Sequence, residues 1–119
     1  MTMSNARKSR IVELARAFAS YMTREELITL GCVTLLAAKI QDTNDIAKAC
    51  EFVSHRTRFE CDPDSIQAAK KMARQARRKP DLLEDATCAA TIAMQMKSTD
   101  ANPEFAATLL FATKPQHIH

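Results

Sequence analysis

The stretch Thr23 to Ile40, TREELITLGCVTLLAAKI, constrains the fold more than any other part of the sequence. From residue 27 onward only two threonines and one lysine are polar, so apolar side chains occur on every side of a helix. A helix that is apolar all round is a buried one. Its start is marked by Thr23 with Glu26 three residues later, a capping box in which each side chain satisfies a backbone N–H of the other residue. We therefore predict a central buried helix on which the other helices pack.

The composition favours helix over sheet in the rest of the chain. The 119 residues include one glycine and four prolines, and the apolar fraction of 46% excludes a wholly disordered chain. Alanine, leucine and methionine are abundant, and all three favour helices. A chain of this length suits one domain. We predict an all-α fold, a compact bundle of five to six short helices in a single domain of residues 1–119, with 1–6 and 114–119 disordered.

Apolar residues at helical spacing locate the other helices. The predicted ranges are 5–22, 45–53, 62–78 and 81–94, and a short last helix follows Asn102 and Pro103. The third of these begins with Asp-Pro, a capping residue followed by proline at the first helical position. In residues 55–60, HRTRFE, apolar and charged side chains alternate, which is compatible with a short extended segment.

Membrane and export signals are not expected. The apolar run of the central helix, residues 27–40, is shorter than the ~20 residues that a membrane span needs. No apolar segment follows the first basic residues, so we expect a cytoplasmic protein with reduced thiols. Among the four cysteines we expect Cys61, in a polar turn, to be exposed, and Cys32, Cys50 and Cys88 to be small core residues.

The formal charge of +3 is unevenly distributed. Residues 56–79 contain eight basic side chains against three acidic ones, whereas residues 80–119 sum to −3. In the helix 62–78 the cations lie on neighbouring turns, which suits contact with phosphates and would position the protein on DNA without reading bases. The alternative for such a run is a solvated helix face. The predicted phosphate-contacting residues of this helix are Lys70, Lys71, Arg74, Arg77 and Arg78.

The sequence gives little support for an enzymatic function. The sequence contains no Gly-rich phosphate loop, no Gly-x-Ser-x-Gly and no His-Glu-x-x-His, so we expect no enzyme and no cofactor. Cys50, His55 and Cys61 could supply three metal ligands, but a structural zinc site needs four with closer pairing, and we expect no metal. Cys61 as a nucleophile with His55 as its base is a further, least supported hypothesis.

The segment FVSHRTRFECDPDSIQ resembles FlhD, the small helical subunit of the FlhDC activator of flagellar genes, which has relatives among activators of conjugative elements. The resemblance covers residues 23–95, and no motif in it is diagnostic by itself. Its matching features are a short helix ending in Val53 and His55, the step Arg58-Phe59-Glu60, a polar turn to Ile66, the paired glutamates Glu25 and Glu26, and the Asp81-Leu82 helix start. The sequence departs by one extra residue in HRTRFE and by a more basic fourth helix.

This resemblance implies a homodimer that joins a larger, zinc-containing FlhC-type subunit, in a complex that binds promoter DNA and recruits RNA polymerase. Arg56 and Arg58 would then lie along the DNA together with the basic helix. The helix 81–94 would face the partner, although ordinary core packing would produce the same stripe. The implied partner-facing residues are Asp81, Leu82, Ala86, Ala89, Ala90, Ala93 and Met94.

Two functions from different classes follow. The leading hypothesis is a non-enzymatic transcriptional co-activator subunit that reaches DNA within a complex. The alternative is a small helical adaptor or inhibitor that binds another protein and never contacts nucleic acid.

Overall fold

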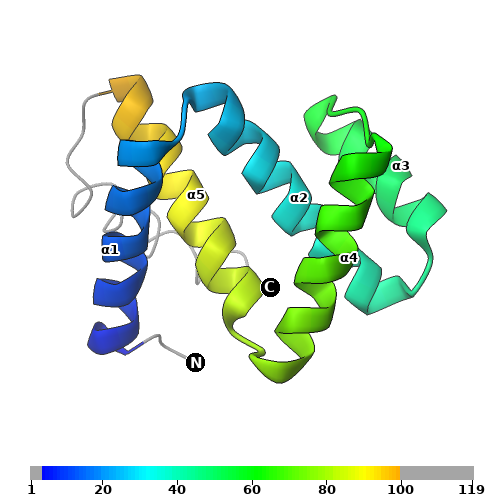
Figure 1. The fold of residues 1–119 in the computed structure, drawn as a ribbon, viewed down its shortest axis with the longest axis horizontal. Helices are drawn as coiled ribbons and strands as arrows, with labels where there is room; N and C mark the ends of the chain where they lie inside the picture. Colours follow the sequence, from blue (N-terminus) through cyan, green and yellow to red (C-terminus); the bar gives the residue numbers. More distant parts are fainter. Residues whose placement is uncertain (1–3, 100–119) are drawn as a thin grey trace, which may run out of the picture. The chain divides into compact units, whose positions relative to one another are not determined.

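Five α-helices make up the part of the chain that the structure, a computed structural model, describes: residues 4–99, with side chains through residue 97 (Figure 1). They are α1 (Asn5–Tyr21), α2 (Arg24–Thr43), α3 (Ile46–Thr57), α4 (Pro63–Arg78) and α5 (Leu82–Thr99). This range contains no strand, and the prediction of an all-α fold is confirmed. The short helix expected after Asn102 and the tail 114–119 lie outside the described residues.

The first two helices begin with side-chain caps. Ser4 accepts a hydrogen bond from the backbone N–H of Arg7 at 3.2 Å, and α1 begins at Asn5, the first residue of the predicted helix 5–22, although residues 5 and 6 also fall in the end that was expected to be disordered. At α2 the predicted capping box is present. The Thr23 hydroxyl accepts from the Glu26 N–H at 3.1 Å, and the Glu26 carboxylate accepts from the Thr23 N–H at 2.8 Å. Both bonds satisfy N–H groups that have no partner within the helix.

The expected extended segment at residues 55–60 is wrong in its first half, because α3 continues through Thr57. The Thr57 hydroxyl donates to the Val53 carbonyl at 2.7 Å, and Arg58 then ends the helix in the left-handed conformation, with φ 60° and ψ 20°. His55 and Arg56 are exposed on the last turn. Over three or four residues, an exposed helix end and an alternating strand give the same sequence pattern.

The described chain divides into two compact units, and the division falls inside two helices. Residues 4–28 and 88–99 form unit 1, and residues 29–87 form unit 2. α2 and α5 therefore each contribute residues to both units. The interpretation of residues 1–119 as one domain stays a prediction.

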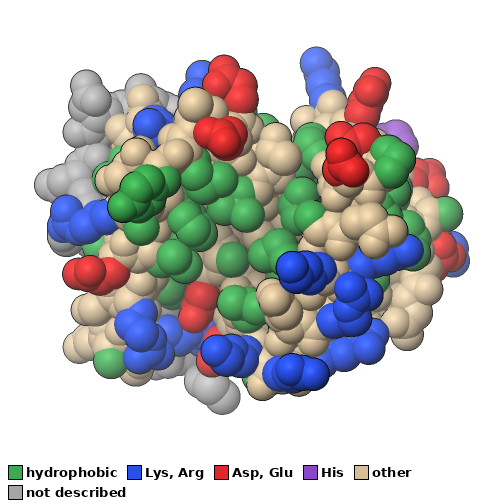
Figure 2. Space-filling view, in the orientation of Figure 1, with side chains coloured by type: hydrophobic (Ala, Val, Ile, Leu, Met, Phe, Trp, Pro, Cys, Tyr) green, Lys and Arg blue, Asp and Glu red, His purple; other side chains and the backbone are tan. Residues whose placement is uncertain are grey.

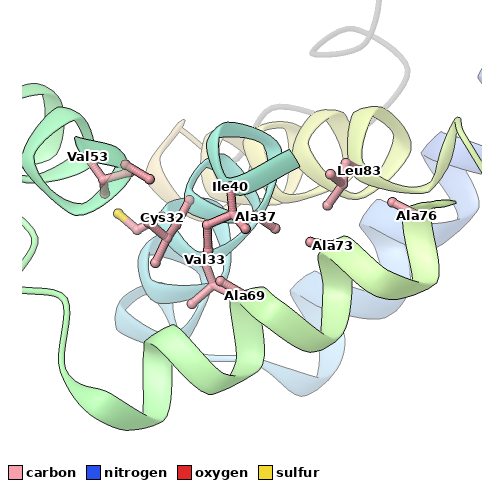
Figure 3. Close-up of a cluster of buried hydrophobic side chains, with 11 residues drawn as sticks. Cys32, Val33, Ala37, Ile40, Val53, Ala69, Ala73, Ala76 and Leu83 are labelled. Carbon is pink, nitrogen blue, oxygen red and sulfur yellow. The ribbon is translucent and has the colours of Figure 1, made fainter. Parts of the chain in front are cut away.

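The core of unit 2 is built on α2, as the apolar run of that helix predicts. Figure 3 shows side chains from four helices converging on it. Leu36 and Ala37 of α2 have no solvent exposure, and Val53 of α3 packs in the same cluster. The buried cluster comprises Cys32, Val33, Leu36, Ala37 and Ile40 of α2, Ala49 and Val53 of α3, Ala69, Ala73 and Ala76 of α4, and Leu83 of α5.

The core of unit 1 joins α1 to α5, which lie side by side (Figure 1). Ile11 and Ala15 of α1 pack against Cys88, Ala89 and Ile92 of α5. The two α1 residues are four apart, so they lie on one face of that helix. None of the helices in the described residues is long and apolar enough to cross a membrane.

Removal of the α2 cap by Thr23→Ala should lower the free energy of unfolding by about 1 kcal/mol, because the Glu26 N–H loses its acceptor. The matched control is Thr29→Ala, the same chemical change at an exposed interior position of the same helix. Alanine has the higher helix propensity, so this variant should lose no stability. Urea unfolding of both variants measures the difference, and equal losses would contradict a capping role.

A larger side chain at the buried alanine position 73 of α4 should also reduce the stability of the fold. Ala73 is 2% exposed, and Ala73→Leu inserts three carbons into a packed core, which should lower the free energy of unfolding by about 1–3 kcal/mol. Ala68→Leu is the control, because Ala68 is exposed on the same helix and should change stability by less than about 0.5 kcal/mol. Similar effects in urea unfolding would mean that α4 does not pack through Ala73.

Candidate nucleic-acid interface

The basic helix α4 starts as the sequence predicts. Asp62 is its N-cap and accepts a hydrogen bond from the Ser65 N–H at 2.7 Å, and Pro63 follows in the first turn. This hydrogen bond to the charged carboxylate lowers the pKa of Asp62 below its ordinary value. The first turn thus has a stabilised negative charge where the helix dipole is positive.

One stripe of α4 faces the core of unit 2 and fixes the rotation of the helix about its axis. The buried residues are Ser65, Ala69, Ala73 and Ala76, spaced four, four and three apart, which places them on one face. The Gln41 side-chain amide of α2 also donates to the Ala73 carbonyl at 3.3 Å. Since the three alanines have only a methyl group, side chains of α2 can approach the α4 backbone closely. The opposite side of α4 is thereby turned to solvent.

The five predicted cations of α4 share that outer side. At ~100° per residue they occupy an arc of about 120° that contains no acidic residue. Lys70 is half-buried and the other four are exposed: Lys71, Arg74, Arg77 and Arg78. Figure 2 shows lysine and arginine side chains gathered over α4. We call these five residues the α4 cation face.

The α4 cation face is not neutralised within residues 4–99, where no carboxylate forms an ion pair with any of its five side chains. The carboxylates of Asp62 and Asp64 lie at the other end of the helix. Like charges at neighbouring helical positions repel one another and reduce helix stability. A polyanion bound along this face would remove that repulsion.

The helix dipole accounts for only part of the cation face. Arg77 and Arg78 are in the last turn, where cations interact favourably with the C-terminal end of a helix. That effect falls off within one turn. Lys70, Lys71 and Arg74 lie further toward the N-terminus, so the dipole does not explain them.

Arg56 and Arg58 form a second group, at the end of α3. Both are exposed, and the acidic residues Glu60, Asp62 and Asp64 separate them in sequence from the α4 cation face. The guanidinium of Arg56 lies 5.2 Å from the centre of the Phe52 ring, and the Lys39 ammonium lies 4.3 Å from the same centre. These are cation–π distances. The position of Lys39 over the Phe52 ring is not visible in the sequence, because a single lysine in an apolar run gives no sign of its aromatic neighbour.

The proposed partner surface on α5 does not exist as an exposed alanine stripe. Ala89, Ala90 and Ala93 have no solvent exposure and Ala86 has 6%, so all four are core residues of this chain. They offer no side-chain surface to another protein in this structure. Of the remaining residues, Asp81 is exposed, and Leu82 and Met94 are half-buried. A partner-facing role for these three stays a prediction.

The thiols are arranged differently from the expectation. Cys61 is half-buried rather than exposed, because the α3–α4 connection folds back and its thiol donates to the Cys50 carbonyl at 3.8 Å. Cys50 is half-buried as well, whereas Cys32 and Cys88 are core residues as expected. Burial, together with the neighbouring Cys50 side chain, raises the pKa of Cys61, which disfavours the nucleophilic thiolate.

The side chains considered for metal binding do not assemble in the described part of the chain. Residues 4–99 contain no group of three or more histidine, cysteine, aspartate or glutamate side chains placed to hold a metal ion. His55 is exposed, and no hydrogen bond joins it to Cys61 within this range. His117 and His119 lie outside the described residues.

Comparison of the chain with protein-family models, with curated proteins and with solved structures gives no match. The resemblance to FlhD therefore stays a prediction that rests on the quoted residues.

The Asp62 cap should make stability depend on acid pH. Because the pKa of Asp62 is lower in the folded chain than in the unfolded one, its contribution is present above the unfolded pKa, ~3.9. The contribution is lost as the pH falls through the folded pKa. Asp62→Asn is the comparison, since asparagine caps a helix about as well but does not titrate. The difference in thermal unfolding midpoint between wild type and variant should shrink toward acid pH, and a constant difference would contradict the linkage.

Proposed function

We propose that this chain is a non-enzymatic transcriptional co-activator subunit that binds DNA phosphates through the α4 cation face. In this proposal the chain forms a homodimer and joins an FlhC-type subunit, and the complex binds promoter DNA. The observation that carries the DNA contact is the row of five α4 cations without an ion pair in residues 4–99. The FlhD-like residues support the identity of the partner and the role in transcription.

The physical basis of the DNA contact is the release of counterions. Each lysine or arginine that neutralises a phosphate frees cations condensed on the duplex, so affinity falls with salt in proportion to the number of contacts. Four of the five side chains are exposed and can reach phosphates without rearrangement. The buried alanines hold the helix backbone in place, which limits the entropy lost on binding to the side chains themselves.

The sharpest experiment compares two double variants with equal net charge. Arg74→Gln plus Arg78→Gln removes two charges from the α4 cation face, and Arg10→Gln plus Arg24→Gln removes two exposed charges from α1 and α2. Binding of a fluorescent DNA duplex is measured over a range of salt concentrations, with the chain alone and with its co-purified partner. The plot of log K against log salt has a negative slope. The first variant should make this slope shallower by about 2, and the second variant should leave it unchanged.

Each outcome bears on the proposal. Equal losses in both variants would show that net charge, and not the α4 cation face, governs affinity. An unchanged slope in the first variant would make that face a solvated surface. Purification of the chain with a cysteine-rich, zinc-binding protein encoded beside it would support the FlhC-type partner, and purification with an unrelated protein only would contradict it.

A second candidate function, a helical adaptor or inhibitor, is favoured by two large apolar side chains exposed in unit 1. Tyr21 at the end of α1 is 87% exposed, and Ile28 of α2 is 43% exposed. Exposed aromatic residues are frequent anchors of protein interfaces. The adaptor predicts a stable protein complex whose formation depends on Tyr21, with no salt-dependent affinity for DNA.

A further inference from the structure

The α3–α4 connection brings two cysteines together that lie eleven residues apart in sequence. Cys50 lies in the second turn of α3 and packs against the core of unit 2, and Cys61 immediately precedes the N-cap of α4. The Cys61 thiol donates to the Cys50 carbonyl oxygen at 3.8 Å, and both side chains pack against the same buried cluster of unit 2. Both side chains are half-buried, so small oxidants in solvent can reach them.

The backbone around Cys61 is fixed by several hydrogen bonds. The Ser54 hydroxyl donates to the Phe59 carbonyl at 3.0 Å, and the Phe59 N–H donates to the Thr57 hydroxyl at 3.1 Å. These bonds fold the connection back along α3, which holds the Cys61 thiol against the backbone of Cys50. The other two cysteines, Cys32 and Cys88, are buried, and they belong to different core clusters.

We propose that Cys50 and Cys61 are a redox modification site, and that they form a reversible disulfide within one chain when a peroxide is the oxidant. One thiol attacks hydrogen peroxide, giving a sulfenic acid and one water. The second thiol displaces the hydroxyl group of that sulfenic acid as another water. The sum is two thiols and one peroxide converted to one disulfide and two waters, with two electrons passing from sulfur to oxygen.

The structure also sets the rate and the effect of this step. The raised pKa of Cys61 keeps its thiolate scarce at neutral pH, so oxidation should be slow there and faster at alkaline pH. The S–S bond of about 2.05 Å requires a closer approach of the sulfurs, which rotation of the two cysteine side chains about their Cα–Cβ bonds can supply while the backbone stays in place. The bond would tie the start of α4 to α3 and restrict the unfolded chain. This inference does not depend on the proposed DNA contact.

The experiment treats the full-length chain with hydrogen peroxide, blocks the remaining thiols by alkylation and digests with trypsin. Cleavage after Lys48, Arg56, Arg58 and Lys70 places the two cysteines in the separate peptides 49–56 and 59–70. The expected product is these two peptides joined, which dithiothreitol separates again. The thermal unfolding midpoint of the oxidised chain should rise and should return to its original value on reduction.

Matched variants decide whether this pair is responsible. Cys50→Ser and Cys61→Ser should each abolish the joined peptide and the rise in unfolding midpoint, whereas Cys32→Ser and Cys88→Ser should retain both if they fold, as checked by circular dichroism. A wild-type chain that forms only higher oxidation states of sulfur, or a disulfide between two chains seen on a non-reducing gel, would overturn the proposal.

Discussion

The burial of three α4 alanines against the core of unit 2 is the constraint on which the rest of the candidate interface depends. Ala69, Ala73 and Ala76 are at most 3% exposed, so the rotation of α4 about its axis is fixed by packing. The cations gain nothing from this burial themselves. They are exposed because the alanines are not. Any change that rotates α4 would move the α4 cation face as a whole and would affect stability and, in the proposed function, DNA affinity as well.

Local signals in the sequence predict the helix starts, because each depends on residues only three or four positions apart. Thr23 and Glu26 form the expected reciprocal bonds, and Asp62 caps α4 at the expected place. The end of α3 is harder to predict from the sequence. Arg58 adopts a left-handed conformation there, although glycine and asparagine are the residues that usually indicate one. The return of Cys61 onto Cys50 is not visible in the sequence, because it depends on how the connection folds back onto α3.

α4 and α5 are both rich in alanine, and a comparison between them explains why the cations of α4 are exposed whereas the alanines of α5 are buried. α4 has cations on the side opposite its alanines, so its pattern shows which side is exposed. In α5 the apolar residues from Leu83 to Met94 extend around most of the helix. That is the pattern of a buried helix, by the same criterion that identified α2. The four buried alanines therefore belong to the core of this chain, which is the alternative that the sequence left open for the same stripe.

The kind of side chain that α4 exposes limits how this chain could act on a promoter in the proposed function. Cations on a helix side that contact phosphates supply affinity and position, but phosphates are alike at every base pair. Reading a sequence in the major groove requires side chains aimed at base edges from an element that enters the groove. The α4 cation face consists of lysines and arginines placed on an arc of about 120°, a breadth that suits a phosphate backbone alongside the helix. A subunit of this kind would gain specificity from a partner that reads bases, and its own contribution would be to strengthen and orient the complex. Within the proposed function, α4 therefore suits a subunit that joins a base-reading partner better than one that recognises DNA alone.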